Sequence, residues 1–178
     1  RFATVMQELS AGLKEVYGAA AAVVVPGGGS YGMEAVARQF AGGQPVLIVR
    51  NGWFSYRWTQ IFEMAGVASS STVLKARRAQ PGATEPFSPA PLEEIVSTIR
   101  ETQPAVVFAP HVETSAGLML PDGHLKAIAE AVHAHEGLFV LDCVASGAMW
   151  VDMQATGVDV LVSAPQKGWS SSPCCAMV

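Results

Sequence analysis

An acid and a lysine follow two apolar segments of the chain. The apolar run 138–141 ends at Asp142, and a second run, 158–162, is followed by SAPQK, which ends at Lys167. If both runs are neighbouring parallel strands, both charged side chains lie at the carboxyl edge of one sheet, where open α/β sheets bind ligands. A lysine there can form a Schiff base with an aldehyde, and an acid can keep a pyridine nitrogen protonated. The pair therefore suits pyridoxal phosphate chemistry.

The segments that must position these residues alternate between strand and helix patterns. Short apolar runs predict strands, and apolar residues at helical spacing predict helices. The predicted strands are 20–25, 46–49, 71–74, 105–108, 138–141 and 158–162, and the predicted helices are 2–17, 31–40, 53–64, 91–102 and 125–135. This alternation predicts a three-layer α/β/α fold with a mainly parallel sheet. The segment 76–90 is rich in Arg, Pro and Gly and predicts an irregular loop.

Composition bounds the class of protein. The 178 residues suffice for one domain, and 50% hydrophobic with 15% charged residues fits strands buried on both faces. A net charge of −4 gives no reason to expect a nucleic-acid partner. The longest apolar run, 19–25, is too short to cross a bilayer, so no membrane association is expected.

The metal-binding and redox residue types form no recognisable motif. Cys143, Cys174 and Cys175 lack CxxC spacing, and His111 with Glu113 gives only two candidate ligands, so we expect no metal. Without a cysteine motif, a reduced, cytoplasmic location is the default expectation. Organelle targeting stays open, because the sequence starts at Arg1 rather than Met.

A glycine-rich segment, PGGGSYG, follows the first predicted strand and precedes a helix. Glycines let the backbone approach a ligand closely, and a helix N-terminus attracts phosphate. We therefore assign Gly29, Ser30 and Tyr31 to a cofactor phosphate, although the segment could be an ordinary strand–helix turn.

The same segment contains a GxGxxG pattern, which is typical of dinucleotide sites. The pattern is formed by Gly27, Gly29 and Gly32. Because Arg50 follows the second strand and could face a 2′-phosphate, an NADP-binding domain remains an alternative. That alternative gives no role to Asp142 with Lys167.

Two further groups follow predicted strands. The segment 51–57 (NGWFSYR) contains Trp53 and Phe54, either of which could stack on a pyridine ring for about 1 kcal/mol beyond burial. Both could equally be core residues of a helix. The segment 111–117 (HVETSAG) follows strand 105–108 and brings hydroxyl groups to the same edge.

Together these segments resemble the class V aminotransferases of fold type I, in particular the alanine–glyoxylate/serine–pyruvate branch. The resemblance is carried by DCVAS (142–146) and SAPQK (163–167), with support from residues 29–34, 51–57 and 111–117. It implies that 1–178 is part of the large, pyridoxal-phosphate-binding domain. It also implies that an N-terminal segment and a C-terminal small domain lie outside this chain.

The resemblance also implies a role for each matching residue. Lys167 would form the Schiff base and move the α-proton, and Asp142 would hold the pyridine nitrogen. Phe54 falls on the stacking position, with Trp53 next to it. The remaining cofactor contacts that the resemblance implies are Gly29, Ser30, Tyr31, Ser115, Val144 and Gln166.

The implied activity is transfer of an amino group from an amino acid to a 2-oxo acid of the glyoxylate or pyruvate type. The resemblance implies a homodimer and a substrate-binding arginine in the C-terminal domain, so residues 1–178 alone are expected to be inactive. A lyase or desulfurase with the same cofactor remains an alternative. Against a desulfurase, Cys174 and Cys175 lie in an apolar, strand-like run instead of a mobile loop. A structural domain without catalysis is a third alternative.

Overall fold

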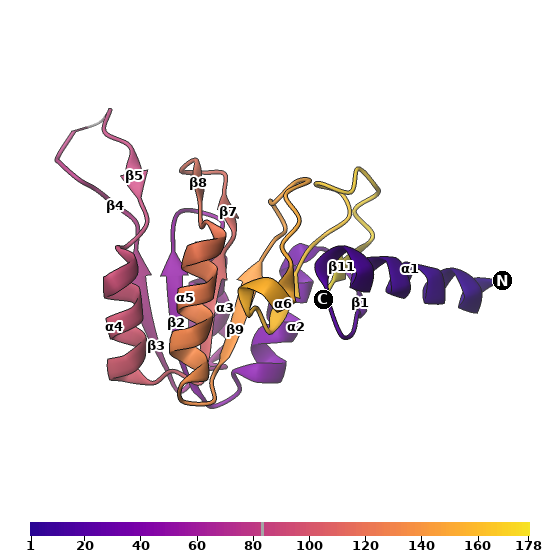
Figure 1. Ribbon diagram of the computed structural model, residues 1–178, viewed down its shortest axis with the longest axis horizontal. Coiled ribbons are helices and arrows are strands. Elements are labelled where there is room, and N and C mark those ends of the chain that lie inside the picture. The colour runs from indigo at the N-terminus through magenta and orange to yellow at the C-terminus, as the bar shows by residue number, and fades with distance from the viewer. Residues whose placement is uncertain (83) are drawn as a thin grey trace.

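The computed structural model describes residues 1–82 and 84–178, and its centre is a parallel sheet (Figure 1). Five strands lie in the order β10-β9-β6-β2-β3, and all neighbouring pairs are parallel. Their bounds are β2 (Pro45–Arg50), β3 (Ser70–Lys75), β6 (Val106–Pro110), β9 (Leu138–Asp142) and β10 (Val160–Val162). The predicted α/β fold with a mainly parallel sheet is confirmed.

Two strands far apart in sequence extend this sheet beyond β10. Strand β1 (Val24–Pro26) pairs antiparallel with β11 (Cys175–Met177). Met177 in turn exchanges two backbone hydrogen bonds with Ser163, just after β10, at 2.8 and 2.9 Å. The predicted strand 20–25 is too long at its start, because β11 pairs only with residues 24–26.

Helices cover both faces of the sheet. They are α1 (Phe2–Tyr17), α2 (Gly29–Phe40), α3 (Tyr56–Ala65), α4 (Leu92–Thr102), α5 (Asp122–His133) and the short α6 (Met153–Thr156). The side chains of α4 and α5 share one apolar cluster with Leu47 and Phe139, and those of α2 and α3 share a second with Ile48 and Phe108. Successive strand residues point to opposite faces, which produces these two clusters and the three layers.

The helix ends follow recognisable signals. Gly18 and Gly66 end α1 and α3 in left-handed conformations with φ of 61° and 57°, as glycine readily does. Helix α5 begins three residues earlier than predicted, directly after Pro121, and Asp122 places a negative charge in its first turn. Helix α3 begins at Tyr56 and not at residue 53, because residues 52–55 form a turn.

Two short hairpins rise beyond the carboxyl ends of the strands (Figure 1). One pairs β4 (Arg77–Arg78) with β5 (Phe87–Ser88), inside the segment predicted to be irregular; residue 83 in that segment lies outside the described residues. The other pairs β7 (Val112–Glu113) with β8 (Leu118–Met119). Neither hairpin was predicted.

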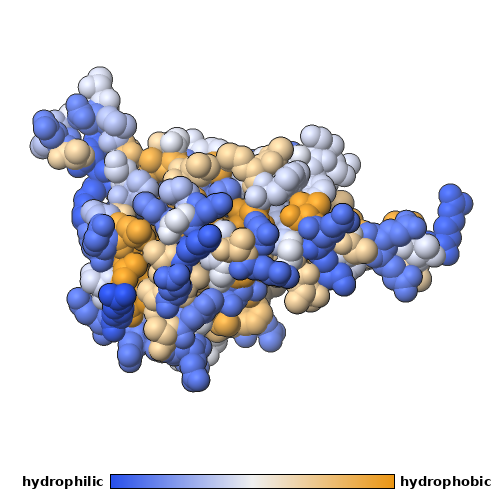
Figure 2. Space-filling view, in the orientation of Figure 1, coloured by the Kyte–Doolittle hydropathy of each residue, from blue (hydrophilic) through white to orange (hydrophobic). Residues whose placement is uncertain are grey.

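Helix α1 projects away from the sheet on the side of β1 and β11, at the right of Figure 1. Phe2 and Val5 on this helix are exposed. Figure 2 shows hydrophobic and hydrophilic residues interspersed over the face that carries α4 and α5. Within residues 1–82 and 84–178, no helix has the length and apolar character needed to cross a membrane.

Candidate functional site

A cavity of about 240 Å³ lies at the carboxyl edge of the sheet and gathers side chains from several strand ends. We call it the polar pocket. The sequence-predicted residues that line it are Gly29, Ser30, Phe54, Asp142, Val144, Gln166 and Lys167. The structure therefore brings the acid and the lysine to one site, together with the start of α2.

Asp142 is the last residue of β9 and is almost fully buried, with 8% of its surface exposed. Burial raises the pKa of its carboxyl to about 6, although a hydrogen bond from Val144 N to Oδ1 (2.9 Å) acts in the opposite direction. The negative charge of Glu113 raises it further. A positive group beside Asp142 would favour its ionised form and lower the pKa again.

The glycine-rich turn packs tightly against the segment that follows Asp142. Helix α2 starts at Gly29, where an added Cβ would lie 3.0 Å from Val144 Cγ2. Gly27 has a φ of 122°, a conformation that only glycine adopts readily. Close backbone approach and the start of α2 give this side of the polar pocket the features of a phosphate site.

Tyr31 does not enter the polar pocket. It is 67% exposed, and a Cβ placed on Gly27 would lie 2.6 Å from the Tyr31 ring. The ring therefore covers the outside of the glycine turn, and the prediction that Tyr31 contacts the phosphate is not supported by its position.

Glu113 fixes the turn that carries the aromatic residues. Its buried carboxylate accepts hydrogen bonds from Phe54 N (3.2 Å), Ser55 N (2.8 Å) and Ser55 Oγ (2.6 Å). Ser115 N (3.3 Å) and Ser115 Oγ (2.6 Å) also donate to it. Burial raises the pKa of Glu113, but the hydrogen bonds from Ser115, Ser55 and Phe54 outweigh it and hold the pKa below its ordinary value. The charged form is therefore the one that holds this turn.

Phe54 and Trp53 both line the polar pocket and are 50% and 69% exposed. The alternative that they are core residues of a helix is wrong, because α3 begins only at Tyr56. Both rings are available to stack on a ligand.

Ser115 lies outside the polar pocket. Its hydroxyl accepts a hydrogen bond from Trp53 N (2.8 Å) and donates to Glu113, so it supports the turn. The preceding residue, Thr114, lines the polar pocket instead. Both residues belong to the turn that follows β7. This turn holds the Ser115 hydroxyl against Glu113 and leaves Thr114 at the polar pocket.

The polar pocket also contains residues that the sequence did not single out. They are Met33, Arg57, Val112, Thr114 and Ala145. Arg57 is the most relevant to chemistry, because it adds a second cation to the site. Arg57 is the last residue of the motif NGWFSYR, so the sequence did place it near the predicted site. Its position after an aromatic residue does not by itself indicate a contact with a ligand.

The loop after β10 delivers Lys167 and Gln166. Gly168 packs so closely on Gly147 that an added Cβ would overlap the Gly147 carbonyl oxygen, at 2.0 Å. Gln166 Oε1 is buried without a hydrogen-bond partner among the described residues. An acceptor of this kind, in a pocket with a buried carboxylate, suits a ligand that carries hydrogen-bond donors.

Within residues 1–82 and 84–178, no group of three or more His, Cys, Asp or Glu side chains could hold a metal ion. His111 and Glu113 are not part of such a group. Its Nδ1 lies 2.8 Å from Ser146 Oγ, and burial lowers the pKa of the imidazole.

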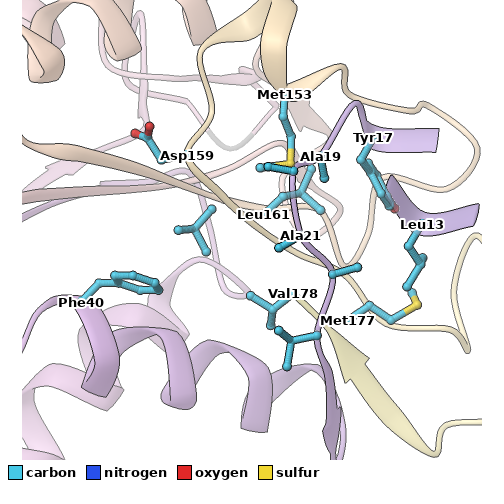
Figure 3. A pocket seen from close by; sticks show the side chains of 14 residues that line it. Leu13, Tyr17, Ala19, Ala21, Phe40, Met153, Asp159, Leu161, Met177 and Val178 are labelled. Carbon is cyan, nitrogen blue, oxygen red and sulfur yellow. The ribbon is translucent and has the colours of Figure 1, made fainter. Parts of the chain in front are cut away.

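A second cavity, of about 250 Å³, is of a different kind (Figure 3). We call it the apolar pocket. It lies between α1, the segment 19–23 and strands β10 and β11, and its walls include Leu13, Leu161 and Met177. Its one carboxylate, Asp159, already binds His133 Nε2 (2.8 Å) and Phe139 N (2.7 Å). Its tyrosine, Tyr17, donates its hydroxyl to Ser163 Oγ (3.3 Å) and accepts a hydrogen bond from Trp169 Nε1 (3.3 Å), so both polar side chains that line the apolar pocket are already hydrogen-bonded.

Comparison with known proteins gives a consistent result. The family model for "Aminotransferase class-V" matches residues 1–172. The chain is 33% identical over 159 residues to "2-aminoethylphosphonate--pyruvate transaminase 2" of Paraburkholderia xenovorans (strain LB400), covering 87% of this chain and 40% of that protein. It is 28% identical over 173 residues to "Alanine--glyoxylate aminotransferase" of Oryctolagus cuniculus, covering 95% of this chain and 41% of that protein.

Two further matches cover nearly the whole chain. The chain is 29% identical over 181 residues to "Soluble hydrogenase, small subunit" of Synechococcus sp. (strain PCC 6716), covering 99% of this chain and 44% of that protein. The crystal structure of ureidoglycine–glyoxylate aminotransferase from Bacillus subtilis superposes with a TM-score of 0.81 at 27% identity, covering 99% of this chain and 43% of that one. The chain thus spans about two fifths of the length of these relatives.

Proposed function

Because the chain belongs to the class-V aminotransferase family, we propose that the whole protein transfers an amino group from an amino acid to a 2-oxo acid of the glyoxylate or pyruvate type. Relatives whose names state pyruvate or glyoxylate as acceptor support this substrate class. The observation that carries the proposal is that Asp142 and Lys167 line one pocket with the start of α2.

The residues of the polar pocket fit pyridoxal phosphate. Gly29 and Ser30 lie at the N-terminus of α2, where a phosphate is favoured. Asp142 is a buried carboxylate whose pKa is raised in the absence of a cation, so a protonated pyridine nitrogen would be a matching partner. Gln166 supplies a buried acceptor. When bound, the cofactor supplies the aldehyde that takes the amino group and the ring that accepts electrons.

Each residue has a task in this proposal. Lys167 Nζ would anchor the cofactor and, once displaced by the substrate amine, would carry the proton from the substrate α-carbon to the cofactor. Asp142 would hold the proton of the pyridine nitrogen. Phe54 would stack on the cofactor ring, with Trp53 beside it, and Val144 lines the pocket next to Asp142. Thr114 replaces Ser115 as the hydroxyl that reaches the ligand.

We further propose that the protein acts as a homodimer and that the arginine for the substrate carboxylate lies outside residues 1–178. All three cysteines are free thiols, which supports the cytoplasmic location that we propose. These statements concern the whole protein, of which the present chain spans only part of the length seen in relatives.

The desulfurase alternative has no support from the site. It requires a cysteine on a mobile loop that reaches the substrate. Cys175 starts strand β11, and neither Cys175 nor Cys174 lines the polar pocket. The dinucleotide alternative is also disfavoured, since Arg50 does not line the polar pocket, where the start of α2 lies.

The direct test is a visible absorption spectrum of the full-length protein with pyridoxal phosphate, before and after borohydride. We expect an absorption band that borohydride fixes covalently to Lys167 and that Lys167→Ala lacks. Lys14→Ala, on α1 and away from the polar pocket, is the matched control and should keep the band. Absence of the band in folded full-length protein would refute the proposal.

A further inference from the structure

A third cavity lies on the other side of the turn that Glu113 holds. It has a volume of about 480 Å³ and is open to solvent at the carboxyl ends of β2 and β3. Its walls include Arg50, Asn51, Trp53, Tyr56, Lys75 and Phe87. We call it the cationic pocket. Trp53 lines both this pocket and the polar pocket, so the two are neighbours.

The cationic pocket has an excess of positive charge. Arg50 and Lys75 are register partners at the ends of β2 and β3, so both emerge at the same place. No Asp or Glu lines this pocket, and within the described part of the chain neither cation forms a salt bridge. The chain as a whole has a net charge of −4, so two cations without a carboxylate depart from the average surface. Such a pocket attracts anions.

Arg50 is held in place with donors to spare. Its Nη1 donates to Thr59 Oγ1 (3.3 Å), and its guanidinium lies 4.8 Å from the centroid of the Tyr56 ring. A guanidinium has five N–H groups, so these two contacts leave a planar pair available to a carboxylate or phosphate. Stacking on Tyr56 fixes the orientation before a ligand arrives.

The side-chain amide of Asn51 is an independent indication that a ligand binds here, because it has no hydrogen-bond partner among the described residues. It is only 2% exposed, and within residues 1–82 and 84–178 neither Nδ2 nor Oδ1 has a hydrogen-bond partner. Its backbone N–H is satisfied by Ser55 Oγ (2.9 Å), so the backbone is fixed while the amide group is left over. Buried polar groups are rarely left without a partner, and a ligand with acceptor oxygens would supply one.

The aromatic side chains that line the cationic pocket indicate what the uncharged part of the ligand is. The rings of Trp53 and Tyr56 lie 6.1 Å apart between centroids, and Phe87, in the β4–β5 hairpin, also lines the pocket. Flat side chains of this kind favour a planar apolar partner. We propose that the cationic pocket binds a small organic anion with a planar ring, whose carboxylate or phosphate lies between Arg50, Lys75 and the Asn51 amide.

This inference does not depend on the proposed transaminase activity, and calorimetry on the full-length protein tests it. Arg57→Gln, in the polar pocket, identifies any anion that binds there instead. The probes are benzoate and phenyl phosphate, with benzylamine as the cationic counterpart and inorganic phosphate as the anion without a ring. We expect the two aromatic anions to bind more tightly than inorganic phosphate, and benzylamine not to bind.

Lys75→Gln is the decisive variant, because Lys75 is exposed and its loss should not disturb folding. We expect it to weaken the aromatic anions roughly tenfold, as loss of a charge-assisted hydrogen bond does. Asn51→Leu and Arg50→Gln should act in the same direction. Arg38→Gln on α2, remote from this pocket, is the control and should leave binding unchanged.

Two results would overturn the proposal. The first is that neither aromatic anion binds to the folded protein. The second is binding that Lys75→Gln leaves unchanged; if Arg57→Gln weakens that binding, the anion lies in the polar pocket. A melting curve on each variant confirms that the comparison is made on folded protein.

Discussion

The polar pocket and the apolar pocket have nearly the same volume, about 240 and about 250 Å³, but they are built differently. Loops at the carboxyl ends of parallel strands form the polar pocket, so backbone groups and charged side chains remain available to a ligand. The sides of α1, β10 and β11 form the apolar pocket, where methyl groups and rings face one another (Figure 3).

Because of this difference, we expect the polar pocket to serve ligand binding and catalysis, and the apolar pocket to contribute to the stability of the fold. A strand end has no further ladder partner, and the residues that follow it are free to serve a ligand. A strand side must bury apolar surface, which favours folding by roughly 25 cal/mol per Å². Substitutions in the two pockets should therefore have opposite consequences for activity and for the free energy of unfolding.

The largest effect is expected at Lys167. Lys167→Ala in the full-length protein removes both the cofactor anchor and the proton carrier, so transamination should fall by roughly 10⁴-fold or more. Its free energy of unfolding, measured without cofactor by urea titration, should change by less than about 0.5 kcal/mol, as for other surface substitutions. A large loss of stability would break the separation between the two pockets.

The converse substitution is Leu13→Ala in the apolar pocket. Leu13 is buried on α1, and truncation of a buried leucine typically costs about 2–5 kcal/mol. Urea unfolding should show this loss, while the cofactor affinity of the folded fraction stays unchanged. Val5→Ala on the exposed face of α1 is the control and should cost little. Equal effects of the two substitutions would mean that α1 is not anchored as described.

Asp142 should make stability depend on pH when no cofactor is bound. Its folded pKa is about 6 against 3.8 for a free side chain, so the native state binds more protons than the unfolded state between these values. Stability should therefore fall as pH rises from about 4 to about 6, by on the order of 3 kcal/mol, and then level off. Urea titrations on wild type and Asp142→Asn measure the difference, and identical pH profiles would contradict the raised pKa.

Glu113→Gln tests the turn that separates the polar and cationic pockets. The amide retains one acceptor oxygen but loses the charge, and it places an NH₂ group against the donors of Ser55 or Ser115. We expect a loss of about 1–3 kcal/mol in urea unfolding. Cofactor affinity should fall as well, because Phe54 is no longer fixed. Unchanged affinity would show that stacking does not need this turn.

The smallest effect distinguishes Thr114 from Ser115. Ser115→Ala removes two hydrogen bonds of the turn and should cost about 1 kcal/mol of stability, with little direct effect on cofactor affinity. Thr114→Val should do the reverse, weakening the cofactor and sparing stability. Measurement of both quantities on both variants decides which hydroxyl serves the ligand.

The fold was predictable because its signals are local. The strands of the parallel sheet are short apolar runs, weakest in β3, and the five longer helices each have an apolar face, whereas the short α6 was not predicted. Once the strands are parallel, the meeting of Asp142 with Lys167 follows from where the runs end. The strand-like run that contains Cys175 is β11, but its antiparallel pairing with β1 was not predictable, since β1 lies about 150 residues away in sequence.

Two of the predicted site residues, Tyr31 and Ser115, do not line the polar pocket, and the reason is the direction of their side chains. The resemblance pointed to Ser115, but the turn after β7 directs its hydroxyl to Glu113 and leaves Thr114 at the polar pocket. Tyr31 was placed on the phosphate, but its ring packs over Gly27 instead. In both cases the residue type was suitable, and only the three-dimensional path of the backbone decided its role.

The pairing of β1 with β11 has a consequence for how the chain acquires its fold. Strand β1 precedes the glycine turn, but its hydrogen-bond partners are Cys175–Met177, which leave the ribosome long after it. Closing a loop of this length is slow, because its entropy must be lost before the contact contributes. We therefore expect the five-stranded sheet to form first, and the glycine-rich turn that follows β1 to reach its final conformation last. Pulse-labelling hydrogen exchange during refolding should then show the amides of β2 and β6 protected before those of β1.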